Sequence, residues 1–146
     1  MSAESSGGPE NNALSELLDV NMPADAEAVA AVVDSISETL ERLEVPEQKR
    51  FEVALAVQEA LANAVVHGCG NDRSKQVRCR LKSDPQGRIV IIVTDPGRGF
   101  SPERQPDPKR GENLYADHGR GVYLIRQLMD EVHFERSGSE IMMWKY

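Results

Sequence analysis

The sequence predicts an α/β fold, because one long helical stretch is followed by segments with the pattern of paired strands. Pro46 to His67 carries apolar residues at helical spacing, and Gly68 provides a C-terminal stop. The segments 77–93 and 132–143 each hold two apolar runs around a turn, as hairpins do. A chain of 146 residues fits a single domain with a substantial core.

The folded domain is expected over residues 13–146. The lead at 1–12 is rich in Ser, Gly, Glu and Asn and has too little apolar surface to offset ordering, so we expect it to be disordered. An extended segment at 17–22 should lead through Pro23 into a first helix, where Asp25 suits the positive helix end. The second helix, at 46–67, should present four apolar residues to the core: Val53, Val57, Leu61 and Val65.

The strand patterns continue the fold after this helix. Residues 77–81 alternate and turn at 84–87 into the continuous apolar run 89–93, which predicts a central strand covered on both faces. Residues 101–117 contain three prolines and many charges, and a loop of this length in a compact domain is expected to be a lid. A helix at 122–129 and the closing hairpin complete the domain.

Composition narrows the possible partners and location. The net charge of -7 argues against direct binding to nucleic acid or to an anionic membrane. No apolar run approaches the length of a membrane span, and no secretion signal is recognisable, so a cytoplasmic protein is expected. The cysteines Cys69 and Cys79 lack a partner at metal-ligand spacing, and Cys79 alternates with apolar neighbours as a small buried residue would.

Three polar residues of the second helix lie four positions apart and should form one stripe: Glu59, Asn63 and His67. An amide and a carboxylate one turn apart suit a site where Asn63 gives an oxygen to Mg²⁺ and Glu59 takes or orients a proton. The alternative is a solvated helix face. His67, next to the terminal glycine, fits a helix cap better than a catalyst.

Two glycine-containing segments could complete a nucleotide pocket. Asp95 follows the buried strand and could accept a hydrogen bond from an amine of a base, while Gly97 and Gly99 allow close backbone approach. The alternative is a plain Asp-Pro-Gly turn, with Phe100 packed inward in either case.

Gly119 and Gly121 open the helix at 122–129, so free N–H groups there could receive phosphate. A glycine-lined loop without a ligand is the alternative. Neither a P-loop nor a dinucleotide fingerprint fits these residues. The cations that could reach a γ-phosphate are Lys109, Arg110 and Arg120.

The order of these motifs resembles the ATP-binding boxes of the Bergerat-type superfamily. This superfamily includes gyrase, Hsp90, histidine kinases and MutL. The boxes are Glu59 to Asn63, the segment 95–100 and the segment 119–122. The first box here ends at His67-Gly68, and the segment 119–125 runs on into 128–132. This short form of the domain is similar to the bacterial anti-sigma-factor serine-protein kinases. Val122, where Leu is usual, and Pro96 are mild departures that should affect packing only.

The resemblance implies a two-layer α/β sandwich, with helices on one face of a mixed sheet and ATP and Mg²⁺ under a lid. It implies Glu59 as catalytic carboxylate and Asn63 as magnesium ligand. Asp95 with Gly97 and Gly99 would read adenine. The implied phosphate-binding residues are Gly119, Arg120, Gly121 and Val122.

The resemblance further implies an ATP-dependent serine/threonine protein kinase that regulates transcription as an anti-sigma factor. As a homodimer, it would bind a sigma factor and phosphorylate a serine on an anti-anti-sigma protein in a partner-switching pathway. One alternative is an ATP-binding regulator that sequesters a partner without catalysis. Another is a detached histidine-kinase catalytic domain, disfavoured because no upstream phosphoacceptor helix is expected. A gyrase-like ATPase is disfavoured because no transducer domain follows Tyr146.

Overall fold

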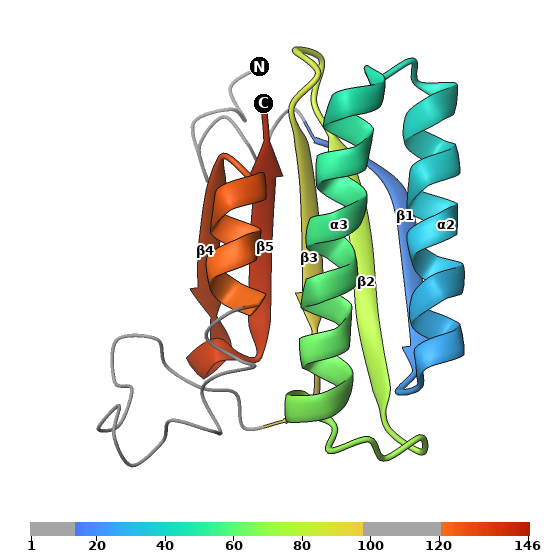
Figure 1. Ribbon diagram of the computed structural model, residues 1–146, viewed down its shortest axis with the longest axis vertical. Coiled ribbons are helices and arrows are strands. Elements are labelled where there is room, and N and C mark those ends of the chain that lie inside the picture. Colours follow the sequence, from blue (N-terminus) through green and yellow to red (C-terminus); the bar gives the residue numbers. More distant parts are fainter. Residues whose placement is uncertain (1–13, 98–120) are drawn as a thin grey trace, which may run out of the picture.

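The computed structural model describes residues 14–97 and 121–146, and these form a sheet with helices on one of its faces (Figure 1). The predicted α/β sandwich is thereby confirmed. The strands are β1 (Ser15–Pro23), β2 (Gln76–Ser83), β3 (Ile89–Thr94), β4 (Glu131–Glu135) and β5 (Glu140–Lys145). The helices are α2 (Ala26–Arg42), α3 (Glu47–Asn63), its π-helical extension η2 (Ala64–Gly68), a helix at 121–128 and the 3-10 turn η4 (Arg136–Gly138).

The sheet has the strand order β1-β2-β3-β5-β4, and each neighbouring pair is antiparallel. The expectation of a mixed sheet was therefore wrong for the described strands. β3 and β4 do run in the same direction, since each is antiparallel to β5. The hairpin partner β5 lies between them, however, and pairs antiparallel with both.

The two long helices begin where the sequence predicted. Asp25 is the N-cap of α2, and its Oδ1 accepts a hydrogen bond from the backbone N of Ala28 at 2.8 Å. Pro46 stands at the N-cap of α3. All four predicted core residues of the second helix are buried, and alanines between them let the helix lie close to the sheet.

The second helix departs from the prediction in its last turn. Residues 64–68 form a π turn, in which the backbone N of Cys69 donates to the carbonyl of Ala64 at 2.9 Å. Such wide turns are frequent at functional sites, and sequence spacing alone does not reveal them.

The core lies between the helices and the sheet. Cys79 is fully buried among apolar side chains of this core, as predicted. A second, smaller cluster on the opposite face consists of Val90, Ile92 and Trp144. β3 is therefore buried on both faces, which confirms its prediction as a central strand.

Two predicted segments, the lead at 1–12 and the lid at 101–117, lie outside the described residues. Within the part of the chain that the structure describes, no helix has the length and apolar character to cross a membrane.

Candidate functional site

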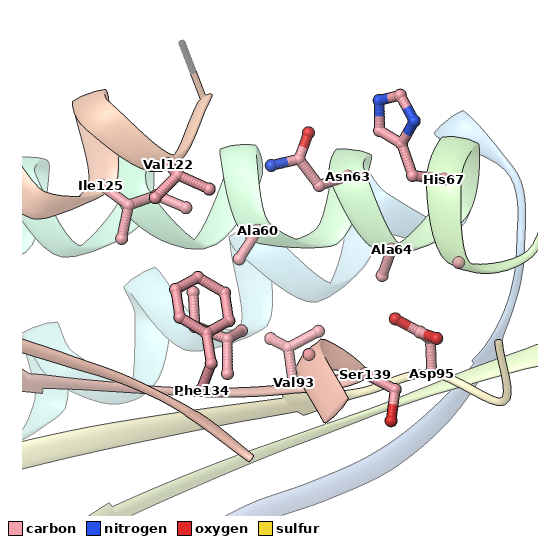
Figure 2. Close-up of a pocket in the computed structure, with 13 residues that line it drawn as sticks. Ala60, Asn63, Ala64, His67, Val93, Asp95, Val122, Ile125, Phe134 and Ser139 are labelled. Carbon is pink, nitrogen blue, oxygen red and sulfur yellow. The ribbon is translucent and has the colours of Figure 1, made fainter. Parts of the chain in front are cut away.

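A cavity of about 50 Å³ lies between the C-terminal part of α3, the ends of the central strands and the helix at 121–128 (Figure 2). Polar groups from the predicted motifs line one side, where Asn63, His67 and Asp95 are found. Apolar side chains of the sheet and the helix line the other, including Val93, Ile125 and Phe134. An apolar cavity with few polar groups is the usual form of a small-molecule site.

Asp95 is a half-buried acceptor in this cavity. Its backbone N donates to the carbonyl of Ser139 at 2.9 Å, which holds the residue against the start of β5. Its Oδ1 accepts a hydrogen bond from the backbone N of Gly97 at 2.8 Å. Burial raises the pKa of the Asp95 carboxyl above its ordinary value, and the hydrogen bond from Gly97 opposes this rise. A carboxylate placed in this way can accept a hydrogen bond from a ligand amine.

Glycine backbone surrounds this carboxyl group closely. A Cβ atom at Gly68 would lie 2.3 Å from Cγ of Asp95 and 2.5–2.6 Å from its two oxygens. A Cβ atom at Gly97 would lie 2.3 Å from the carbonyl oxygen of Gly68. Real Cβ atoms do not approach other atoms so closely, so both positions require glycine here. The sequence had indicated Gly68 only as a helix stop, and its contact with Asp95 was missed.

The start of the helix at 121–128 lies against the polar stripe of α3. A Cβ atom at Gly121 would be 2.8 Å from Nδ2 of Asn63 and 3.2 Å from Oε1 of Glu59. Val122 lines the cavity beside them. The structure therefore brings together one residue from each predicted motif: Asn63, Asp95 and Gly121.

His67 lines the same cavity, one turn beyond Asn63 on the helix (Figure 2). Glu59 is half-buried and lies one turn before Asn63, beside the place where the helix at 121–128 begins. The carboxylate of Glu59 and the amide of Asn63 thus both lie beside Gly121, and of the two only Asn63 lines the cavity. Hard oxygen donors in such a pair fit a divalent cation or a hydroxyl group that approaches a bound phosphate.

Several cavity residues escaped sequence reasoning. Phe134 was predicted only as a strand residue and Ser139 only as part of a turn, yet both line the cavity. Ser139 is buried, and its Oγ donates to the carbonyl of Arg136 at 2.9 Å. Ser139 directly precedes the last strand, β5, which runs antiparallel to β3, so the start of β5 lies beside Asp95. This position in the sequence was the signal that could have indicated Ser139 as a site residue.

Other predicted residues lie outside the described part of the chain: Gly99, Phe100, Lys109, Arg110, Gly119 and Arg120. Among the described residues, no group of three or more His, Cys, Asp or Glu side chains could hold a metal ion by itself. A magnesium ion at Asn63 would therefore need further ligands from a nucleotide or from water, which is how Mg²⁺ is usually bound.

Comparisons of the sequence with a family model and with known proteins agree on one family. The family model of the histidine kinase-like ATPase domain matches residues 22–145. The serine-protein kinase RsbW of Bacillus subtilis is 30% identical over 143 residues, which cover 93% of this chain and 88% of the relative. RsbW of Staphylococcus aureus is 27% identical over 138 residues, which cover 90% of this chain and 87% of the relative.

Two solved structures share the fold. The RsbU and RsbW domains of a Mycobacterium tuberculosis protein give a TM-score of 0.61 at 16% identity, covering 88% of this chain and 32% of that one. The SiaB–SiaC complex from Pseudomonas aeruginosa gives a TM-score of 0.58 at 13% identity, covering 89% of this chain and 88% of that one. At these identities the likeness supports the architecture alone.

Proposed function

Because the chain belongs to the histidine kinase-like ATPase family, and within it to the RsbW type of serine-protein kinase, we propose that it is an anti-sigma factor of a partner-switching pathway. In this role it binds a sigma factor and transfers phosphate from ATP to a serine of an anti-anti-sigma protein. We further propose that it acts in the cytoplasm, as a homodimer, with Mg²⁺ as the metal.

The observation that carries the proposal is the meeting of three motifs at one cavity. Asp95 offers a half-buried carboxyl group at one end, and the start of the helix at 121–128 lies against Asn63 and Glu59 at the other. If residues 95–97 were only a turn, and if the polar stripe of α3 were only a solvated helix face, neither segment would need to lie against the other motifs.

Each residue has a distinct task in this proposal. Asp95 accepts a hydrogen bond from the exocyclic amine of adenine, and the apolar wall formed by Val93, Ile125 and Phe134 excludes water from the base. Asn63 holds Mg²⁺ through its amide oxygen. The backbone N–H groups that would receive the phosphates belong to Gly119, Arg120, Gly121 and Val122.

When bound, Mg-ATP would supply the phosphoryl group that is transferred. Glu59, near the edge of the cavity, would orient the attacking serine hydroxyl and accept its proton. The carboxylate suits this task because it lies one helical turn before the magnesium ligand, on the side where the helix at 121–128 begins. A protein substrate can approach at this edge, since Glu59 is half-buried rather than enclosed.

The direct test uses radiolabelled ATP with the purified protein and each serine-bearing regulator encoded beside it. We expect label on one regulator, and no label when its acceptor serine is changed to alanine. Nucleotide binding without transfer to any co-encoded candidate would instead favour a non-catalytic regulator that sequesters its partner. Absence of nucleotide binding by the folded protein would refute the site itself.

A further inference from the structure

Lys145 is a largely buried cation that belongs to none of the predicted motifs. It is the last residue of β5, and the strand period of two places its side chain on the same face as Ile141 and Met143, which pack in the core. Its side chain is 13% exposed. Lysine side chains are rarely enclosed to this extent without partners, so the contacts of the ammonium group indicate its task.

The ammonium group of Lys145 bridges two helices. Its Nζ donates to the backbone carbonyl of Leu128 at 2.5 Å, and Leu128 is the last residue of the helix at 121–128, which we call the short helix. The same Nζ lies 2.8 Å from Oε1 of Glu52, near the start of α3. Carbonyls in the last turn of a helix lack a partner within the helix, and a nearby cation is favourable there. Lys145 therefore caps the short helix and joins this cap to α3.

Glu52 is held in place for this contact. Its Oε2 accepts a hydrogen bond from Nε2 of Gln48, one turn earlier on α3, at 3.0 Å. The hydrogen bonds from Lys145 and Gln48 lower the pKa of Glu52, so its carboxyl group is ionised at neutral pH. The ammonium group thus meets a charged acceptor on α3 and a carbonyl acceptor on the short helix.

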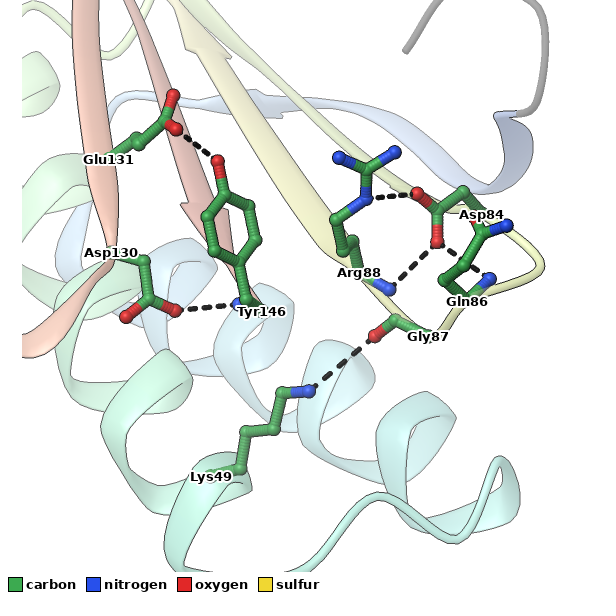
Figure 3. Close-up of polar contacts among 8 residues, drawn as sticks. All are labelled: Lys49, Asp84, Gln86, Gly87, Arg88, Asp130, Glu131 and Tyr146. Carbon is green, nitrogen blue, oxygen red and sulfur yellow. Dashed lines mark hydrogen bonds and ion pairs between the residues drawn. The ribbon is translucent and has the colours of Figure 1, made fainter. Parts of the chain in front are cut away.

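The chain that follows the short helix is also tied to β5. The backbone N of Asp130 donates to the carbonyl of Trp144 at 2.8 Å. The backbone N of Tyr146 donates to Oδ2 of Asp130 at 2.6 Å (Figure 3). These bonds hold the end of the short helix on the sheet, and Lys145 adds a link from this end to α3.

The short helix and α3 also meet at the cavity, at the opposite end of the short helix. Glu52, Glu59 and Asn63 follow one another at intervals of seven and four residues, so they lie on one face of α3. The start of the short helix, at Gly121, lies against Glu59 and Asn63, while its end is joined to Glu52 through Lys145. The two helices therefore run antiparallel and are in contact at both ends of the short helix (Figure 1).

The contact at the cavity is tight. A Cβ atom at Gly121 would lie 2.8 Å from Nδ2 of Asn63, so the backbone of the short helix is closer to α3 than a residue with a side chain would permit. The short helix has eight residues and is only about 12 Å long. A displacement at Leu128 would therefore tilt the helix and change the position of Gly121.

We propose that Lys145 is a positioning residue for the phosphate end of the nucleotide site. By joining Leu128 to Glu52, it sets the separation of the short helix from α3. This separation keeps the backbone N–H group of Gly121 in place against Asn63. The proposal rests on the proposed function, in which the start of the short helix receives the phosphates of ATP. It adds a residue that controls phosphate binding from the far end of that helix.

The first test compares Mg-ATP with adenosine, which has the base but no phosphates. Lys145→Met keeps an unbranched side chain and removes the donors. It should lower the affinity for Mg-ATP by about tenfold, as loss of a charge-assisted hydrogen bond does, and leave the affinity for adenosine unchanged. NMR titrations well below the unfolding temperature measure both affinities. A lysine that served stability alone would change the unfolding temperature and neither affinity, which would overturn the proposal.

Lys49→Met is the matched control. Lys49 lies at the same end of α3, but its Nζ donates to the carbonyl of Gly87 at 3.5 Å, in the turn between β2 and β3 (Figure 3). This variant should keep both affinities, and a loss of Mg-ATP affinity equal to that of Lys145→Met would overturn the proposal.

Glu52→Ala tests the link to α3. It should lower Mg-ATP affinity in the same direction as Lys145→Met, because the ammonium group then holds the short helix without its anchor. The double variant of Lys145→Met with Glu52→Ala should lose no more affinity than Lys145→Met alone, since both changes break one bridge. Losses that add in full would show that the two residues act independently and would overturn the bridge.

The second test uses the protein without nucleotide and so separates this proposal from the proposed function. In Lys145→Met, the NMR signals of the Gly121 backbone amide and of the Asn63 side-chain amide should shift, and in Lys49→Met they should not. Unchanged signals in a Lys145→Met protein with a native circular dichroism spectrum would overturn the proposal. Shifted signals together with a wild type that binds no ATP would contradict the proposed function instead.

Discussion

Gly68 and Asp95 are in such close contact that a Cβ atom at position 68 would lie 2.3 Å from Cγ of the carboxyl group. Gly68 is the last residue of the π turn at 64–68, and Asp95 directly follows β3. A backbone that approaches a carboxyl group so closely fixes its position. Gly68 thus acts as a positioning residue for the group that is proposed to read adenine.

The first prediction concerns this contact. Gly68→Ala should displace the Asp95 carboxyl group and lower ATP affinity by about tenfold or more, the usual effect of losing a hydrogen bond that involves a charged group. Calorimetric titration with Mg-ATP measures the change. Gly87→Ala is the control, because Gly87 also has a demanding backbone conformation, with φ at +88°, but lies in the turn between β2 and β3. It should lower stability without changing affinity, and equal affinity losses in both variants would contradict the role of Gly68.

The second prediction uses the raised pKa of Asp95. A carboxyl group whose pKa is higher in the folded state opposes folding when it ionises. This cost is absent below the ordinary pKa, grows as the pH rises past it, and is complete above the raised pKa of the folded state. Asp95→Asn removes the ionisation and keeps an oxygen for the N–H of Gly97. We expect the unfolding temperature without nucleotide to stay the same or rise at pH 7, while stabilisation by Mg-ATP is largely lost. A variant that unfolds at a much lower temperature would show that the carboxylate serves the fold.

The third prediction concerns the ion pair of β1 and β2. The hydrogen bond from Arg78 is the main cause that lowers the pKa of Asp19 from 3.8 to about 2. Its stabilising effect is therefore complete above about pH 4 and is lost as the pH falls toward 2. Carboxyl chemical shifts followed by NMR should show this midpoint, and Arg78→Ala should raise it toward 3.8. Arg80→Ala should shift it less, since Arg80 acts on Asp19 only through charge. A wild-type midpoint near 3.8 would disprove the pairing in solution.

The fourth prediction concerns the two free thiols. Burial raises the pKa of Cys69, and burial raises the pKa of Cys79 to about 12, so neither forms a thiolate readily at neutral pH. In the native protein both should resist a thiol reagent such as Ellman's reagent, and both should react after denaturation. Glu38→Cys, at an exposed position, is the positive control. Rapid labelling of native Cys79 would show that the core opens there.

Much of this fold could be predicted because its elements have strong local signals. Pro46 marks a helix start, and the run at 89–93 has the composition of a strand buried on both faces. The strand order could not be derived in this way, because it depends on β5 folding back between β3 and β4. The π turn at 64–68 likewise has no signal in the spacing of the sequence.

The site residues likewise divide into those with a local signal in the sequence and those that depend on the tertiary structure. Asn63 and Asp95 were predicted as site residues, and the structure places both at the cavity. Phe134 and Ser139 were missed, because they reach the cavity only through the pairing of β5 with its neighbours. The contact between Gly68 and Asp95 joins segments far apart in the chain, so no local pattern could reveal it.

The most direct test of the central claim, that Glu59 is the catalytic carboxylate beside a nucleotide held by Asn63 and Asp95, is the rate of phosphate transfer by Glu59→Ala at saturating Mg-ATP. The account predicts that the rate falls by about 10²-fold or more, as loss of a general base usually causes, while ATP affinity is largely kept. Asn63→Ala is the comparison and should reduce both affinity and rate through loss of magnesium. An unchanged rate of transfer by the Glu59 variant, with the wild type active in the same assay, would contradict the account.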